Sequence, residues 1–268
     1  MVQPRAAGIL LVLATLVGSG SPALAQEEDG RGSLVYTAEA GAGYGWYSDD
    51  YENGESLFAR FAINRPDEWT WRFETGWGSR FGQTGRALSV TFIRVLDNGV
   101  TFSLGASGGS GLLAPERRFD ASISRPFLSR DQLILTLRAK DEQSQLVNST
   151  RGVSGGFVYY FPEHWIWESN VYWDRGQPGD TNSTGISTAL TYGVYKRWYL
   201  VAGFSYGDAS YVIVGDDDVL VDLKGRGYSL GLTRYVKPHW GFNSRVEYGS
   251  NSAYSGSGVQ LSVFREWR

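Results

Sequence analysis

The 268-residue chain contains no cysteine and only one methionine. The absence of cysteine excludes a disulfide-stapled scaffold, and the chain is long enough to fold without one. After residue 25, no segment approaches about 18 consecutive apolar residues, so transmembrane helices are excluded. Basic residues are not in excess either, because 25 Lys and Arg stand against 28 Asp and Glu. This balance argues against nucleic acid as a partner.

The first 25 residues have the pattern of a secretory signal peptide. Arg5 supplies the positive charge, residues 6–17 form an apolar run, and Ala23-Leu24-Ala25 is a small-residue cleavage site. The apolar run is too short to span a membrane as a helix. We therefore expect a single mature domain over residues 26–268, whose net charge changes from −3 to −4 with the loss of Arg5.

What the chain has in quantity is glycine and aromatic residues: 35 Gly and 15% Phe, Trp and Tyr. Its mean hydropathy is nevertheless negative. A soluble core would be richer in aliphatic residues. A barrel wall with one face in lipid and the other in water accounts for the mixture.

Hydrophobic and polar residues alternate along the chain, as in half-buried strands. The clearest example is residues 34–47, where the even positions are apolar or aromatic and the odd positions are polar or glycine. The same template fits fourteen segments: 34–47, 56–65, 69–79, 87–96, 100–108, 117–125, 132–140, 152–162, 165–174, 184–192, 197–206, 227–236, 239–249 and 257–267. The pattern predicts an all-β fold, a transmembrane antiparallel up-and-down β-barrel of fourteen strands. Twelve strands is the alternative, if one weak pair of segments, for example 117–125 with 132–140, is something else.

The connections alternate between tight turns and longer polar segments. The tight turns are 65–68, 97–99, 162–164, 195–197 and 237–239, and the longer segments are 48–55, 141–151, 174–183, 207–226 and 249–256. Outer-membrane barrels have short periplasmic turns and longer outer loops, so both ends of the barrel domain are expected on the periplasmic side. In the longest segment, apolar stretches at 211–214 and 219–221 predict a hairpin that projects beyond the membrane.

Aromatic residues recur eight positions apart, which puts both members on the same face of a strand. Eight tilted residues span about 20 Å, close to the apolar height of a membrane barrel. Trp and Tyr favour both edges of that band. The predicted girdle residues are Trp46, Trp69, Trp77, Trp165, Trp173, Trp198, Tyr206, Trp240 and Tyr248.

The opposite face predicts a charged lumen. Its candidate solute contacts are Arg60, Arg72, Glu74, Arg138, Lys140, Glu168, Asn170, Tyr172, Asn243, Arg245 and Glu247, with Tyr47 and Tyr199 beside them. Two interpretations stay open. Pairs of Arg and Glu could cross-link neighbouring strands in a plugged lumen. Alternatively, the lumen is a narrow channel in which aromatic rings and mixed charges bind a polar or sugar-like solute.

No catalytic or metal site is expected from the sequence, and no cofactor. The two histidines, His164 and His239, each precede a Trp in a predicted periplasmic turn, far from the outer rim where barrel hydrolases work. Asp216, Asp217, Asp218 and Asp222 lack the ligand alternation of a calcium loop and are read as a solvated outer loop. The segment 105–111 (GASGGSG) lacks the Lys-Ser/Thr of a phosphate loop and is read as a flexible loop.

Three features resemble the YaiO family of outer-membrane β-barrels. They are the Asp-containing first loop at 47–50, the Trp-rich third strand ending in Ser79-Arg80-Phe81-Gly82, and the aromatic last strand 261–267. The resemblance implies a non-enzymatic protein of the bacterial outer membrane, associated in some members with exopolysaccharide export. The implied partners are membrane lipid and lipopolysaccharide, the barrel-assembly machinery and components of polysaccharide export. One departure is that Arg268 follows Trp267, whereas such chains usually end on the aromatic residue.

The residues, taken with what the resemblance implies, leave three functions open. The first is a narrow channel or accessory barrel for polar or saccharide solutes. The second is a closed barrel that acts through its outer loops. The third is a barrel enzyme acting on lipid A or peptide, which the positions of the histidines disfavour.

Overall fold

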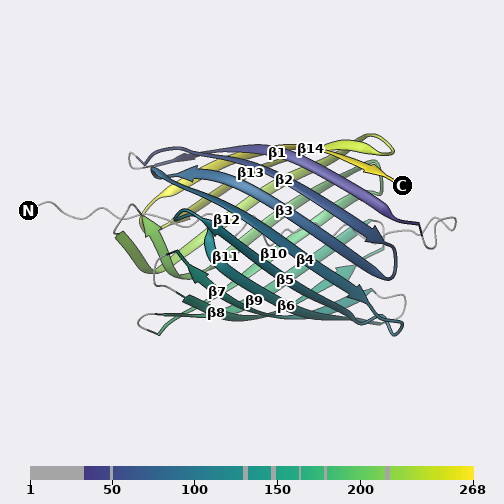
Figure 1. Cartoon of the computed structure of the whole chain (residues 1–268), viewed down its shortest axis with the longest axis horizontal. Helices are drawn as coiled ribbons and strands as arrows, with labels where there is room; N and C mark the ends of the chain where they lie inside the picture. Colours follow the sequence, from purple (N-terminus) through teal and green to yellow (C-terminus); the bar gives the residue numbers. More distant parts are fainter. Residues whose placement is uncertain are drawn as a thin grey trace, which may run out of the picture.

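The structure is a closed antiparallel barrel in which each strand pairs with its neighbours in sequence and β1 pairs with β14 (Figure 1). This computed structural model describes residues 33–48, 51–128, 132–145, 149–162, 164–177, 180–214 and 218–268. The predicted signal peptide, residues 1–25, lies outside the described residues. No helix in this part of the chain is long and apolar enough to cross a membrane.

The strands are β1 (Val35–Tyr47), β2 (Gly54–Arg65), β3 (Trp69–Arg80), β4 (Gln83–Val95), β5 (Thr101–Ser110), β6 (Pro115–Phe127), β7 (Leu133–Ser144), β8 (Ser149–Tyr160), β9 (Trp165–Gln177), β10 (Thr181–Val194), β11 (Trp198–Val214), β12 (Asp218–Lys237), β13 (Trp240–Asn251) and β14 (Ser255–Trp267). The fourteen-strand prediction is therefore confirmed. The twelve-strand alternative is wrong, because β6 and β7 pair with each other from Pro115↔Ser144 to Phe127↔Leu133.

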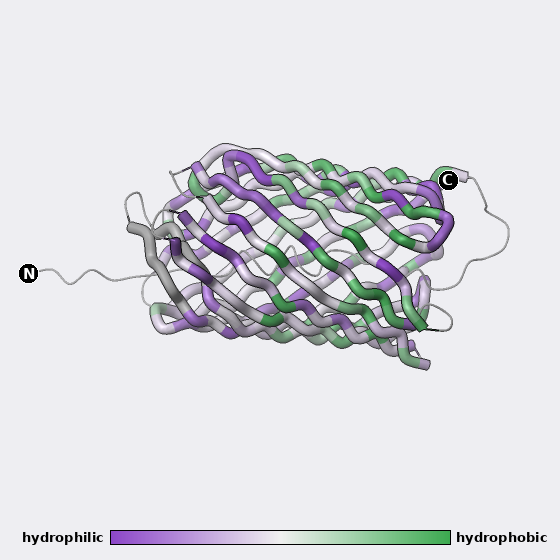
Figure 2. Tube along the Cα trace, turned by 90° about the horizontal axis from the view of Figure 1, so that it is seen from below, coloured by the Kyte–Doolittle hydropathy of each residue, from purple (hydrophilic) through white to green (hydrophobic). Residues whose placement is uncertain are grey.

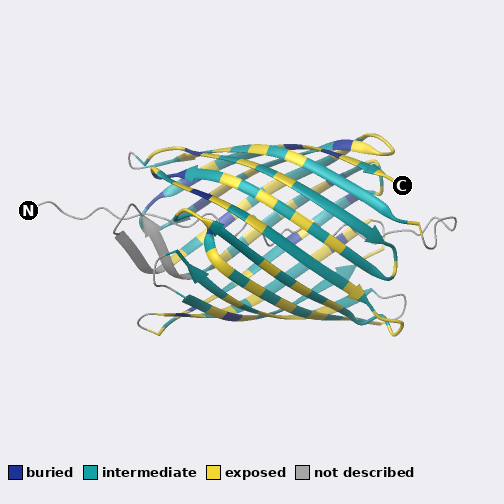
Figure 3. Cartoon of the chain, in the orientation of Figure 1, coloured by how far each residue is buried: buried dark blue, intermediate teal, exposed yellow. Residues whose placement is uncertain are grey.

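Hydropathy and exposure both alternate along the strands (Figures 2 and 3). Successive side chains of a strand point to opposite faces of the wall, which accounts for this alternation. One hydrogen bond identifies the inner face: Asn243 Nδ2 on β13 donates to Glu39 Oε1 on β1 at 2.9 Å, although β14 lies between them. Backbones two strands apart are separated by about 9.6 Å, and their side chains converge only on the concave side. Glu39 and the residues paired with it in register therefore face the lumen. The opposite face carries exposed apolar side chains such as Leu137 (66%) and Leu104 (61%).

Several periplasmic turns contain a residue with a positive φ angle. Asp67, His164 and Lys196 have φ values of 63°, 71° and 54°, and Gly99 has 78°. Short hairpin loops often require a residue in this left-handed region just before the next strand. His164 therefore has the same left-handed conformation in its turn as Asp67 and Lys196 have in theirs, which is a structural role. His239 is not among the residues with positive φ, so the two histidines are not equivalent in backbone geometry.

On the outer side, several predicted loops are strands. β9 continues to Gln177 and β7 to Ser144, so most of the predicted loops 174–183 and 141–151 are paired backbone. The predicted loop 207–226 is the projecting end of the β11–β12 hairpin, paired from Asp208↔Lys224 to Val214↔Asp218. The flexible-loop reading of 105–111 is also wrong for residues 105–110, which belong to β5, where Gly108 pairs with Leu88. The two strands of a hairpin satisfy each other's backbone N–H and C=O groups by hydrogen bonding. Strand pairing therefore does not have to stop where the lipid ends.

Candidate functional site: the charged lumen

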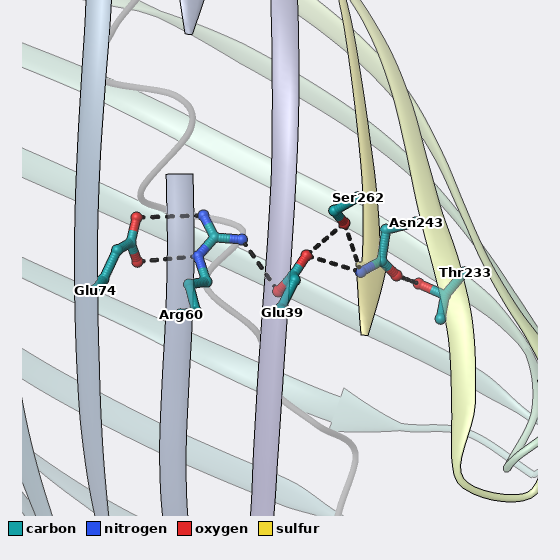
Figure 4. A network of polar contacts seen from close by, with 6 residues as sticks. All are labelled: Glu39, Arg60, Glu74, Thr233, Asn243 and Ser262. Carbon is teal, nitrogen blue, oxygen red and sulfur yellow. Dashed lines mark hydrogen bonds and ion pairs between the residues drawn. The ribbon is translucent and has the colours of Figure 1, made fainter. Parts of the chain in front are cut away.

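A chain of polar contacts crosses the inner wall over six strands, from β3 to β12 through the β1–β14 seam (Figure 4). Arg60 on β2 lies between two carboxylates: its Nε donates to Glu74 Oε2 at 3.0 Å and its Nη1 to Glu39 Oε2 at 3.4 Å. The other Glu39 oxygen accepts from Ser262 Oγ at 2.5 Å and Asn243 Nδ2 at 2.9 Å. Thr233 Oγ1 completes the chain by donating to Asn243 Oδ1 at 2.7 Å. Glu39 is the hub of this network.

A second cluster lies on β6, β7 and β9. Arg118 makes a bidentate pair with Asp120, with Nε and Nη2 both at 2.8 Å from the carboxylate oxygens, and its Nη1 donates to Glu142 at 3.2 Å. Lys140 Nζ donates to Asp174 Oδ2 at 2.8 Å across the intervening strand β8. This bridge passes over Gly152, where a Cβ would collide with Asp174 and approach Lys140 Cε to 2.8 Å. Glycine at that position is what makes room for the ion pair.

The pairing register brings each of the predicted lumen residues to the inner face. Glu168 and Asn170 on β9 and Arg245 and Glu247 on β13 border a cavity on the inner face of the wall. Small residues of β10 to β12 line the cavity between them: Ser187, Ala189, Gly203, Gly227 and Ser229. Because these side chains are short, the charged groups of β9 and β13 share the same open space.

The predicted lumen residues differ in the contacts that they make. Tyr172 reaches over Gly185 and donates to the backbone oxygen of Asp208 at 3.4 Å. Arg245 and Glu247 form an ion pair at 3.4 Å on their own strand. Arg138 faces Ser122 and Ser154, is exposed within the lumen, and has no carboxylate of the described chain at ion-pair distance. It is therefore an uncompensated lumen cation.

Several network residues were not among the sequence-based candidates: Glu39, Arg118, Asp120, Glu142, Asp174 and Ser262. Strand parity could have found some of them, because Arg118 and Asp120 alternate with Phe119 and Ala121 within a predicted strand. Glu142 was assigned to a loop because the predicted strand stopped at residue 140, and Asp174 was placed at the boundary between the predicted strand 165–174 and the predicted loop 174–183. The prediction ended where the apolar alternation ended, but the backbone pairing continues.

These polar contacts run along the wall and not across the bore. Every ion pair between strands in the described residues joins adjacent strands or strands separated by one. The Glu74 and Arg60 side chains keep 44% and 35% of their surface exposed, although both face inward. Among the described inward-facing side chains, cations and anions are nearly equal in number. The wall thus presents charged groups to water without linking opposite sides.

The outer mouth is narrowed on one side by an aromatic cluster. Tyr47, Tyr51, Phe81 and Tyr254 come from three different hairpins and pack with ring centroids 4.6–6.0 Å apart. Phe81 has a left-handed φ of 54° in the turn between β3 and β4, and its ring is buried against Tyr47 and Tyr254. The guanidinium of Arg80 covers the Phe81 ring at 5.1 Å.

The predicted girdle residues all have lipid-facing register positions. Trp46 (49%), Trp77 (39%), Trp173 (44%), Tyr206 (52%) and Tyr248 (43%) are exposed on the outer half, and Trp165 and Trp240 (39% each) on the periplasmic half. Trp69 and Trp198 are half-buried between neighbouring side chains.

The histidines and acidic residues do not form a site in the described part of the chain. His164 and His239 lie in different turns, separated by four strand spacings or about 20 Å along the wall. No group of three or more His, Cys, Asp or Glu there has the arrangement to hold a metal. Asp216 and Asp217 of the predicted solvated loop lie outside the described residues.

Comparison with known proteins identifies the family of this barrel. The model of the YaiO membrane β-barrel domain matches residues 36–212, more than half of the chain. The chain belongs to the YaiO family. As a YaiO barrel it lies in the bacterial outer membrane, with its apolar outer face against lipid. No curated protein matches the sequence.

Solved outer-membrane barrels share the fold of this YaiO barrel. Omp33 of Acinetobacter baumannii has 11% sequence identity and a TM-score of 0.56, with 86% of this chain and 98% of that chain covered. The anion-selective porin of Comamonas acidovorans has 8% identity and a TM-score of 0.52, over 88% and 99% of the two chains. A bacterial polysaccharide outer-membrane secretin has 11% identity and a TM-score of 0.50, again over 88% and 99%. At these identities the likeness extends to the fold alone.

Proposed function

We propose that this barrel is a narrow, non-enzymatic channel for small polar or saccharide-like solutes. The observation that supports it best is the direction of the lumen pairs, which follow the wall and leave Glu74 and Arg60 exposed to water. Pairs between neighbouring strands alone would also suit a plugged lumen, but in a plugged lumen the paired side chains would be buried, whereas these two stay exposed. Charged groups in nearly equal number suit a neutral, hydroxyl-rich solute better than a strongly charged one. The saccharide part of the proposal comes from the family resemblance.

Single-channel conductance in planar bilayers tests this function. Folded protein should give discrete conductance steps. Arg138→Glu reverses the charge of an uncompensated lumen cation and should shift the ion selectivity toward cations. The matched control is Arg151→Glu, which makes the same change on the outward face of the neighbouring strand, where Arg151 is 83% exposed. The control should leave selectivity unchanged, and equal shifts in both variants would contradict the proposal.

A closed barrel that works through its outer loops is the second candidate. The aromatic cluster of Tyr47, Tyr51, Phe81 and Tyr254 favours it, because these packed rings narrow the outer mouth on one side. Bilayers that stay silent with heat-modifiable, folded protein would favour this function over the channel. In either case, we propose that strand β14 is read by the barrel-assembly machinery and that the outer rim contacts lipopolysaccharide. Polysaccharide-export components are the proposed partners of the saccharide channel.

A further inference from the structure

Cations and tryptophans alternate on the lipid-facing side of the periplasmic rim. Strands β2, β4, β12 and β14 carry an outward arginine near their periplasmic end, and the neighbouring strands β3, β11 and β13 begin there with an outward tryptophan. Trp69 pairs in register with Arg65 and Arg94, Trp198 with Arg234, and Trp240 with Arg265. An indole and a guanidinium side by side at this height suit the interface between acyl chains and headgroups.

The densest part of this arrangement is on β12, β13 and β14. Trp240 pairs with Arg265 on one side and, through a β-bulge, with Lys237 on the other. Arg234 pairs with Phe242, the next outward residue after Trp240. All three cations and Trp240 are exposed. We call Arg234, Lys237, Trp240 and Arg265 the basic corner.

No carboxylate in the described chain neutralises the basic corner. None lies at ion-pair distance from its three cations, whereas Arg65, further along the rim, is paired with Glu68 at 3.0 Å. Glu266, the acidic residue next to Arg265, faces the lumen, where it accepts from the Tyr235 hydroxyl at 3.2 Å. The corner thus keeps three positive charges beside an interfacial indole.

We propose that the basic corner binds the phosphate headgroup of an acidic phospholipid in the periplasmic leaflet. Guanidinium groups bind phosphate oxygens in bidentate geometry, and the Lys237 ammonium adds a further donor. The Trp240 ring and the apolar wall beside it pack against the upper acyl chain. Clusters of Lys and Arg on membrane-protein surfaces bind lipid headgroups by this chemistry.

The outer rim supplies a matched control. Arg86, Arg151 and Arg226 are also exposed on the lipid-facing side, so replacing them removes the same charge. Their local partners differ, however. Arg151 is paired with Asp141 at 2.9 Å, and Arg86 and Arg226 donate to Ser110 and Ser250 at 2.9 and 3.1 Å.

Spin-labelled lipids test the proposal on the reconstituted full barrel. In phosphatidylcholine vesicles, the motionally restricted fraction of labelled phosphatidylglycerol is compared with that of labelled phosphatidylcholine. Each cation near a charged headgroup contributes about fivefold in affinity. We therefore expect a preference for phosphatidylglycerol that falls at least fivefold in the variant Arg234→Gln/Lys237→Gln/Arg265→Gln. The control Arg86→Gln/Arg151→Gln/Arg226→Gln should keep it.

Two results would overturn the inference. One is a wild-type barrel with no preference for the acidic lipid, and the other is an equal loss in both triple variants. If the corner variant does not fold to a heat-modifiable barrel, Arg265→Gln and Arg265→Lys are compared instead. Only the glutamine variant should lose the preference, since lysine keeps the charge. This outcome does not depend on whether the lumen conducts.

Discussion

Replacing Glu39 is expected to destabilise the barrel far more than replacing Glu74, although both carboxylates pair with the same arginine. The Glu39 side chain is only 16% exposed and accepts from Arg60, Ser262 and Asn243. Hydrogen bonds to a charged group contribute about 1.5–3 kcal/mol each. Glu74 is 44% exposed, and a pair of that kind contributes about 0–1 kcal/mol.

The expected losses follow from what each variant leaves unpaired. In Glu39→Ala, Arg60 keeps Glu74, and Asn243 keeps Thr233 and Ser262, so the loss is less than three full bonds. We expect about 3 kcal/mol for Glu39→Ala and at most about 1 kcal/mol for Glu74→Ala. Glu39→Gln should lie between them, because the amide oxygen can still accept from Asn243 after the charge is lost.

Equilibrium unfolding by urea from phospholipid vesicles measures these differences, followed by tryptophan fluorescence and by heat-modified mobility on gels. Both readouts should give the same order of midpoints. The reasoning is refuted if Glu74→Ala costs as much as Glu39→Ala, or if Glu39→Ala stays within about 0.5 kcal/mol of wild type, the range of neutral surface changes. Either result would mean that the β1–β14 seam is held by its backbone ladder alone.

Two matched pairs of substitutions probe the two faces of the wall with the same unfolding assay. Gly152→Ala places a methyl group against the carboxylate of Asp174 and should cost about 1–3 kcal/mol by overpacking, whereas Gly155→Ala on the same strand meets only Leu137 Cδ2 at 3.5 Å and should be nearly neutral. Comparable losses at both positions would contradict this account. Val90→Arg puts a charge on the lipid face of β4 and should cost about 2–4 kcal/mol, whereas Ser89→Arg faces the lumen opposite Glu74 and should cost less than 1 kcal/mol. The assignment of faces fails if the order is reversed.

The sequence was sufficient for the barrel because membrane strands obey a strict rule. One face meets lipid and the other meets water, so side chains such as Trp77 and Glu74 must alternate. The rule predicted the number of strands and the inward position of residues such as Arg60 and Glu168. It stopped working where the strands leave the membrane, because lipid no longer selects apolar residues there. Glu142 lies beyond that point and was assigned to a loop, and Asp174 lies at the boundary where the predicted strand ended.

Partners within the lumen could not be predicted from alternation alone. Parity tells which face a residue occupies, but a contact between β1 and β13 depends on barrel closure and register. Glu39 illustrates the limit. In the sequence it is one polar residue among glycines and Thr37, while its three donors lie on β2, β13 and β14.

Glycine explains how a thin wall holds so many inward polar groups. Three bridges between next-nearest strands pass directly over a glycine of the strand between them. Lys140 reaches Asp174 over Gly152, Tyr172 reaches the Asp208 backbone over Gly185, and the rings of Tyr235 and Phe264 meet 5.0 Å apart over Gly241. Any side chain at these glycines would occupy the space of the bridge. Each glycine therefore leaves room for a contact that joins its two flanking strands on the concave face. The bridging groups can then lie close to the wall. The high glycine content thus allows the lumen charges to pair along the wall. These pairs do not cross the centre of the lumen.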